Sequence, residues 1–131
     1  MSNKLLRLSQ VTIVFALGML LANGAIAQDA MWPGGTALDF GSFEQRGVER
    51  VDTLVLFNDT DEAFVIENIR PSCGCTAVDW PVAPISPGEE VGIPVAFRCT
   101  KGGEVERHLD VYLSHLRSRE RIYVYADCPL R

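Results

Sequence analysis

The chain has 131 residues with a formal net charge of −5, and 47% of its residues are hydrophobic. This length allows one domain with a sandwich-sized core, and it is too short for a TIM barrel or for a Rossmann unit joined to a substrate domain. Because an acidic excess repels phosphates, the composition argues against a nucleic-acid binder and against electrostatic docking on an anionic membrane.

The first 27 residues have the pattern of a cleaved secretory signal peptide. Lys4 and Arg7 form a short basic start, residues 11–21 form an apolar stretch, and residues 25–27 (Ala-Ile-Ala) form a small-x-small cleavage site. A membrane anchor is the alternative, but an anchor needs about 20 apolar residues and polar residues interrupt this run. We therefore expect a periplasmic or secreted protein that leaves the membrane after cleavage, in a compartment where disulfides persist.

The rest of the chain is typical of a short lead-in followed by strands. Residues 28–36 predict a flexible lead-in. After residue 36, short hydrophobic stretches alternate with turn-rich segments, and no window supports a long amphipathic helix. We expect seven strands, over residues 37–43, 51–57, 64–70, 76–80, 90–97, 105–113 and 121–128.

Alternation with a period of two residues predicts an all-β fold. In the fifth stretch, for example, Val91, Ile93, Val95 and Phe97 alternate cleanly with other residues. Seven short strands in about 100 residues fit an immunoglobulin-like antiparallel β-sandwich, which we place over residues 37–131. Proline cannot donate to a strand ladder, so Pro94 predicts that the fifth strand is an edge strand or is bulged there.

Several short motifs follow one another in a recognisable order. They are Leu-Asp-Phe-Gly (38–41), Leu-Phe-Asn (56–58), Phe-Val-Ile (64–66), Ser-Cys-Gly-Cys-Thr (72–76), Ile-Ser-Pro-Gly-Glu (85–89) and Ile-Pro-Val-Ala-Phe (93–97). In this order the chain resembles the DUF1573 family of secreted bacterial proteins, which is similar to the immunoglobulin-like modules of major sperm protein and of cilium-associated proteins.

The resemblance to DUF1573 covers residues 37 to about 126. The Ser-Cys-Gly-Cys-Thr and Pro-Gly-Glu elements are its specific parts. It implies an immunoglobulin-like fold and an extracytoplasmic compartment, and it implies no reaction because the family has no established activity. Cys99 and Cys128 are additions to the plain form of the family.

The four cysteines, Cys73, Cys75, Cys99 and Cys128, are expected to gather at one end of the sandwich. If successive strands alternate in direction, the third, fifth and seventh strands finish at the same end, and the cysteines follow or close these strands. Cys99 and Cys128 share the phase of the expected core residues of their strands. Both should therefore point toward the core from opposite sheets.

Three interpretations of the cysteines stay open. An even number in a small secreted domain favours structural disulfides, with three possible pairings. The inward phase slightly favours a Cys99–Cys128 bridge over pairing of Cys73 and Cys75 with the other two. The second interpretation is a redox-active dithiol at Cys73 and Cys75, and the third is a zinc or copper site made by all four thiolates. Because paired Cys-x-x-Cys motifs are absent, we expect no metal and no cofactor.

The last two strands carry a candidate partner-binding face. Tyr112, Tyr123 and Tyr125 are expected to point outward, with Arg107 and Arg121 nearby. Since these strands are neighbours in immunoglobulin-like sheets, the side chains would form one aromatic patch, and Tyr and Arg are enriched at interface hot spots. Ordinary cross-strand pairing that stiffens the sheet is the alternative.

No constellation of catalytic residues accompanies these features. His108 and His115 lack an evident serine or aspartate partner for a triad, and no glycine-rich phosphate loop is present. We therefore expect a protein that is not an enzyme: a cysteine-stapled binding or structural module with a protein partner in the cell envelope. Thiol redox or soft-metal handling at Cys73 and Cys75 is the alternative function.

Overall fold

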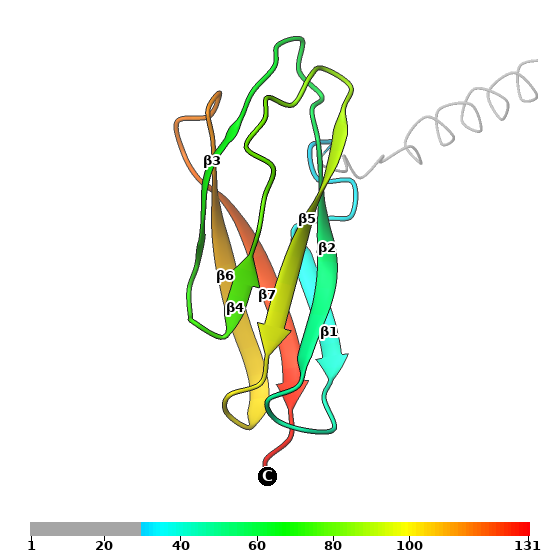
Figure 1. Cartoon of the computed structure of the whole chain (residues 1–131), viewed down its shortest axis with the longest axis vertical. Coiled ribbons are helices and arrows are strands. Elements are labelled where there is room, and N and C mark those ends of the chain that lie inside the picture. The colour runs from blue at the N-terminus through cyan, green and yellow to red at the C-terminus, as the bar shows by residue number, and fades with distance from the viewer. Residues whose placement is uncertain (1–29) are drawn as a thin grey trace, which may run out of the picture.

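The computed structural model describes residues 30–131, which form two β-sheets packed face to face (Figure 1). The strands are β1 (Ala37–Ser42), β2 (Glu49–Phe57), β3 (Ile66–Pro71), β4 (Thr76–Val78), β5 (Glu90–Arg98), β6 (Gly103–Leu113) and β7 (Glu120–Cys128). One sheet has the order β1-β7-β6-β3 and the other β2-β5-β4. The predicted all-β, immunoglobulin-like sandwich is confirmed. The predicted signal peptide, residues 1–27, lies outside the described residues.

The two sheets meet through the alternate residues that the pattern predicted. Buried side chains come from β2, β5, β6 and β7 at every second position, and they form one hydrophobic core. The core residues of these strands are Leu54, Leu56, Ile93, Val95, Phe97, Leu109, Val111, Leu113, Ile122, Val124 and Ala126. Burial of this apolar surface is the main term that favours the fold.

The first strand departs from a purely antiparallel sandwich, because β1 pairs with β7 in parallel. Leu38 lies opposite Val124 and Asp39 lies opposite Tyr125, and the register shifts before Ser42. Gly41 occupies this irregular point with a φ of 68°, and its N–H donates a 2.8 Å hydrogen bond to the Asp39 carboxylate. A side chain at that φ would be strained, so the glycine allows β1 to bend there.

Pro94 lies in a strand that is central for only part of its length. β5 pairs with β2 without a bulge, and β4 covers its other side only along residues 95–97. Pro94 follows directly beyond the end of β4, and its carbonyl accepts the Asp79 N–H at 3.4 Å. The proline therefore stands where β5 has lost a partner strand, which explains why the missing donor is tolerated.

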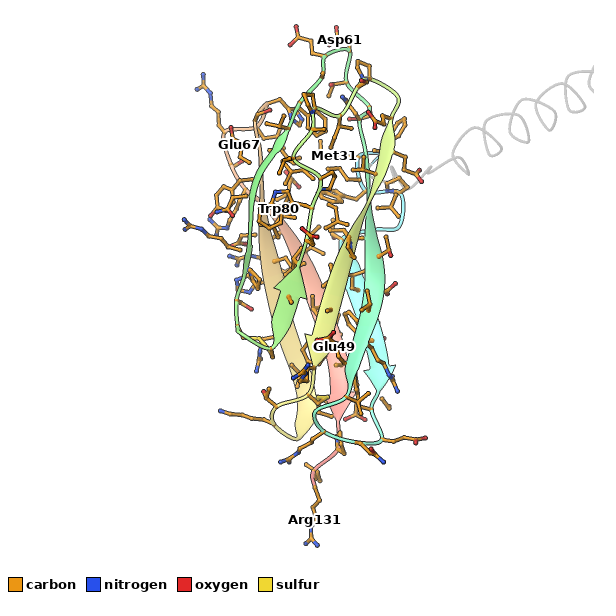
Figure 2. The ribbon with its side chains drawn as sticks, in the orientation of Figure 1. Met31, Glu49, Asp61, Glu67, Trp80 and Arg131 are labelled. Atoms are coloured by element: carbon orange, nitrogen blue, oxygen red, sulfur yellow. A yellow bond between two sulfur atoms is a disulfide. The ribbon has the colours of Figure 1, made fainter. Side chains whose placement is uncertain are left out.

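The lead-in is packed rather than flexible from residue 31 onward. Trp32 is 1% exposed and belongs to the core. The Met31 carbonyl accepts the Phe57 N–H at 2.9 Å, and the Thr36 carbonyl accepts the Tyr123 N–H at 2.8 Å. Met31 lies toward the upper end of the molecule (Figure 2). The glycines and proline around Trp32 are typical of a loop, but one large apolar side chain inserts this loop between the sheets.

Asn58 holds the loops at the upper end of the sandwich together. Its side chain is 0% exposed, and Nδ2 donates to the carbonyls of Glu62 at 2.8 Å and Ile85 at 2.9 Å. Its Oδ1 accepts from the N–H and the hydroxyl of Thr60 at 2.9 and 2.6 Å. A buried amide is stable only when its donors and acceptors are satisfied, and Asn58 satisfies them with backbone groups from two loops and with the Thr60 hydroxyl.

Replacing Trp32 with alanine should destabilise the domain strongly, because it removes a large buried side chain and leaves a cavity. We expect the free energy of unfolding to fall by about 3–5 kcal/mol, measured by urea denaturation of the mature protein. Val82 is mostly exposed, so Val82→Ala is the control and should change stability by less than about 0.5 kcal/mol. Equal stabilities for the two variants would contradict the packed lead-in.

Candidate functional site

The Cys99–Cys128 disulfide ties the two sheets together. It joins the end of β5 in one sheet to the end of β7 in the other, with a Cα–Cα distance of 5.7 Å. Both residues are buried, at 1% and 3% exposure, in agreement with the inward phase expected from the sequence. The bridge spans 29 positions of the chain, so it constrains a long loop in the unfolded state.

The Cys73–Cys75 disulfide lies in the loop that connects β3 to β4 and bridges residues only two positions apart. This loop is at the lower left in Figure 1. The Arg98 N–H donates to the Cys75 carbonyl at 3.0 Å. Cys75 therefore lies beside the last residue of β5, which directly precedes Cys99. The four cysteines therefore lie at one end of the sandwich, as predicted, but as two separate bridges.

Both bridges bear on the alternative functions of the cysteines. The described residues contain no free cysteine, so in this disulfide form none of the four can supply a thiolate to zinc or copper. Among residues 30–131 no group of three or more His, Cys, Asp or Glu side chains is arranged to hold a metal ion. The redox interpretation of Cys73 and Cys75 stays a prediction.

The outer face of the β1-β7-β6-β3 sheet carries most of the predicted aromatic patch. Tyr123 and Tyr125 are exposed on β7, and their rings stack with centroids 6.4 Å apart. Tyr112 lies on the same face of β6, but the pair formed by Asp110 and Arg121 separates it from the other two tyrosines. The Arg70 guanidinium instead lies 5.8 Å from the centre of the Tyr112 ring. The patch is thus a stacked pair plus an isolated ring.

The two arginines of the predicted face differ in position. Arg121 lies beside the tyrosines and belongs to the outer face. Arg107 pairs with the buried Val124, so it has the opposite phase, and its guanidinium donates to the neighbouring Glu106 carbonyl at 2.7 Å. Placing Arg107 in the aromatic patch was wrong, because on β6 it alternates with the outward-facing residues.

Asp110 is the centre of an ion-pair network on this face. Its carboxylate accepts two hydrogen bonds from Arg121, at 2.8 and 3.1 Å, and Arg119 approaches to 3.2 Å. The hydrogen bond from Arg121 holds the pKa of Asp110 below its ordinary value, although partial burial opposes the shift. The Asp110 carboxylate is therefore paired with two guanidinium groups.

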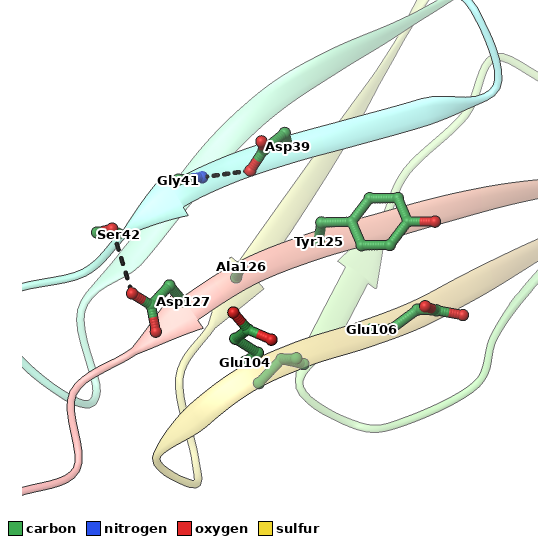
Figure 3. A pocket seen from close by; sticks show the side chains of 9 residues that line it. Asp39, Gly41, Ser42, Glu104, Glu106, Tyr125, Ala126 and Asp127 are labelled. Atoms are coloured by element: carbon green, nitrogen blue, oxygen red, sulfur yellow. Dashed lines mark hydrogen bonds between the residues drawn. The ribbon is translucent and has the colours of Figure 1, made fainter.

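The lower half of the same face is a shallow acidic groove of about 550 Å³ (Figure 3). Carboxylates come from β1, β6 and β7, namely Asp39, Glu104, Glu106 and Asp127, and the Tyr125 ring lies among them. Ser42 donates a 3.4 Å hydrogen bond to Asp127. Within residues 30–131 none of the four carboxylates has an ion-pair partner, so this half of the face carries unmatched negative charge.

Sequence reasoning missed this groove. The alternation of Glu104, Glu106 and His108 placed the two glutamates on the outward phase of β6, which was a usable signal. Asp39 joins them only because β1 lies beside β7 in parallel, and its local sequence carries no sign of that pairing.

No helix in residues 30–131 is long and apolar enough to cross a membrane.

Comparison with known proteins identifies similar folds. A family model described as "Protein of unknown function (DUF1573)" matches residues 34–128, and no curated protein matches in sequence. A solved protein of unknown function from Porphyromonas gingivalis W83 aligns with a TM-score of 0.62 and 14% identity, covering 71% of this chain and 44% of that one.

Two further structures share the sandwich. The YadV chaperone aligns with a TM-score of 0.54 and 16% identity over 72% of this chain and 49% of that one. The VesB protease of Vibrio cholerae aligns with a TM-score of 0.53 and 13% identity, over 70% of this chain and 30% of that one. The chain spans less than half the length of each of the three structures. At these identities the similarity concerns the fold alone.

The two disulfides should contribute unequally to stability. Loop-closure entropy predicts a loss of about 3–4 kcal/mol for Cys99→Ala with Cys128→Ala, against about 1.5 kcal/mol for Cys73→Ala with Cys75→Ala. Urea denaturation without reductant measures both losses. If the second pair of substitutions destabilises as much as the first, the Cys73–Cys75 bridge is a structural cross-link of equal weight.

The Asp110 network should make stability depend on pH in the acidic range. Because its folded-state pKa is lowered, Asp110 stabilises the fold above its ordinary pKa of 3.8, and this contribution is lost as pH falls through the folded-state value. Asp110→Asn should cost about 1 kcal/mol at pH 7 and progressively less below pH 4. Arg121→Gln should flatten the same part of the profile, and a cost that is constant down to pH 2 would refute this origin.

Proposed function

The chain belongs to the DUF1573 family of proteins of unknown function, and we propose that it is an extracytoplasmic immunoglobulin-like module that binds a protein partner and does not act as an enzyme. The leader pattern and the two disulfides support a location outside the cytoplasm, where such bridges persist. The single observation that carries the binding role is the stacked tyrosine pair beside an acidic groove on one sheet face.

The tyrosine pair provides the apolar part of the proposed contact. Tyr123 and Tyr125 are fixed on a central strand of their sheet and stack on each other, so little side-chain entropy is left to lose on binding. Each ring presents an apolar surface that ends in a hydroxyl group. Such rigid amphipathic side chains are the residues that dominate the binding energy of protein interfaces.

The acidic groove indicates that the proposed partner carries positive charge. The Asp110 carboxylate is already paired with Arg121 and Arg119, whereas the groove half has four carboxylates with no cationic partner among the described residues. A segment bearing lysine or arginine would pair with these carboxylates and would also place a cation near the Tyr125 ring. The proposed partner is therefore a basic segment of an envelope or extracellular protein.

Capture from an envelope extract, followed by binding measurements with the purified partner, tests this function. Tyr123→Ser combined with Tyr125→Ser should weaken binding at least about tenfold, because it removes both aromatic anchors. Glu104→Gln combined with Glu106→Gln should also weaken binding and should reduce its dependence on salt, because it removes charge without removing volume.

The matched control is Val51→Ser, which changes an exposed side chain of the other sheet. It should leave the affinity unchanged. Recovery of the same partners at the same strength with the double tyrosine variant would refute the role of this face. A loss of equal size with Val51→Ser would show that the weakening is not specific to the outer face of β6 and β7.

A further inference from the structure

We propose that the Cys73–Cys75 disulfide is a thiol–disulfide exchange site that oxidises a pair of cysteine thiols on another protein. The bridge lies in the β3–β4 loop and belongs neither to the stacked tyrosines nor to the acidic groove. The exchange is stoichiometric, with one bridge consumed per protein molecule, and it goes beyond the proposed binding function. Four observations carry it: the small ring, its partial exposure, its anchored backbone and a hydroxyl group beside both sulfurs.

The Cys73–Cys75 bridge does little that a structural cross-link does. It joins no two strands, because both cysteines belong to one loop. The neighbouring Cys99–Cys128 bridge already ties the ends of β5 and β7. Since a cross-link stabilises in proportion to the freedom that it removes from the unfolded chain, a ring of three residues removes little.

The small ring is open to reaction. Cys73 and Cys75 are half-buried, whereas Cys99 and Cys128 are buried. Gly74 between them is exposed, and a Cβ added there would meet no atom within 4 Å. The Gly74 side of the ring is therefore uncovered, and the ring is more accessible than the buried Cys99–Cys128 bridge. The more accessible bridges of a protein are the more labile ones.

The backbone around the ring is held without the S–S bond. On one side the Ser72 N–H donates to the His108 carbonyl at 2.9 Å, and the His108 N–H donates to the Ser72 hydroxyl at 3.0 Å. On the other side the Arg98 N–H donates to the Cys75 carbonyl at 3.0 Å. These bonds fix the loop to both sheets, so opening the bridge need not unfold the domain.

Thr76 places a hydroxyl group beside both sulfurs. Thr76 and Asn58 are the two buried polar residues of the described chain, and Thr76 is 5% exposed. Its hydroxyl oxygen lies 3.9 Å from Cys73 Sγ and 4.0 Å from Cys75 Sγ, and the two sulfurs are its hydrogen-bond partners. A disulfide sulfur is a weak acceptor and a thiolate is a strong one, so this contact strengthens as the S–S bond breaks.

Because the two distances are nearly equal, the Thr76 hydroxyl can donate a hydrogen bond to either sulfur when that sulfur becomes the leaving thiolate. In the first step a thiolate of the other protein attacks one Sγ, the S–S bond breaks, and its electron pair goes to the second Sγ. In the next step a second thiolate of that protein attacks the mixed disulfide and releases the remaining cysteine of this chain. The other protein gains a disulfide and gives up two electrons and two protons, which convert Cys73 and Cys75 to thiols.

The test uses the oxidised mature protein with a synthetic peptide that contains two cysteines as the dithiol probe. Free thiols are alkylated at intervals, and mass spectrometry locates them. We expect Cys73 and Cys75 to become alkylated while Cys99 and Cys128 stay bridged, with circular dichroism unchanged and peptide disulfide formed in equal amount. Simultaneous reduction of both bridges, or reduction only in urea, would overturn the proposal.

Thr76→Val tests the hydroxyl, because valine keeps the shape of the side chain and removes the donor. It should slow the reduction of Cys73–Cys75 about tenfold, since a hydrogen bond to a charged group is lost. Thr76→Ser keeps the donor and should stay near the wild-type rate, which separates the loss of the hydroxyl from a change in folding. Equal rates for the valine variant and the wild type would exclude Thr76 from the reaction.

Discussion

The parallel pairing of β1 with β7 is the constraint on which the rest of the molecule depends. It places the first strand of the domain beside the last one and turns β7 into an inner strand of its sheet. The segment before β1 then enters the core with Trp32. At the other end of β1, Phe40 and Phe43 pack against the ring of Phe97 from the opposite sheet.

The same pairing brings two sheet edges together. The Arg50 guanidinium of β2 donates to the Phe40 carbonyl at 3.0 Å and lies 4.2 Å from the centre of the Phe43 ring. One side chain thus joins the unpaired edges of both sheets. On the opposite edge of the sandwich the chain itself crosses between the sheets, through the loop that carries Cys73 and Cys75. Covalent chain therefore crosses between the sheets at both edges, through residues 43–48 at one and through the β3–β4 loop at the other, and the Arg50 contact is an additional link at the first edge.

Most of the fold could be predicted from the sequence, because the local alternation of hydrophobic and polar residues indicates the strand positions and the inward phase of Cys99. Trp32 could not be assigned, since its neighbours are typical of a loop and only the assembled sheets create its pocket. The acidic groove depends on Asp39 meeting Tyr125, a contact between distant parts of the chain. Arg107 is a different case, because it shares the phase of Val105 and Leu109, which already indicated that it faces inward. The contact of Thr76 with both sulfurs could not be predicted, because it depends on how the β3–β4 loop folds.

The buried position of Asn58 has a consequence for how the protein can be produced. Residues 58–60 (Asn-Asp-Thr) match the acceptor sequon for N-linked glycosylation. In the fold the Asn58 side chain is fully enclosed and its amide nitrogen donates to Glu62 and Ile85. A sugar attached to that nitrogen during synthesis would occupy the space of these loops and prevent the upper end from closing. A eukaryotic secretory host would therefore modify the chain at a position that the native domain needs inside, whereas a host without this modification leaves it free to fold.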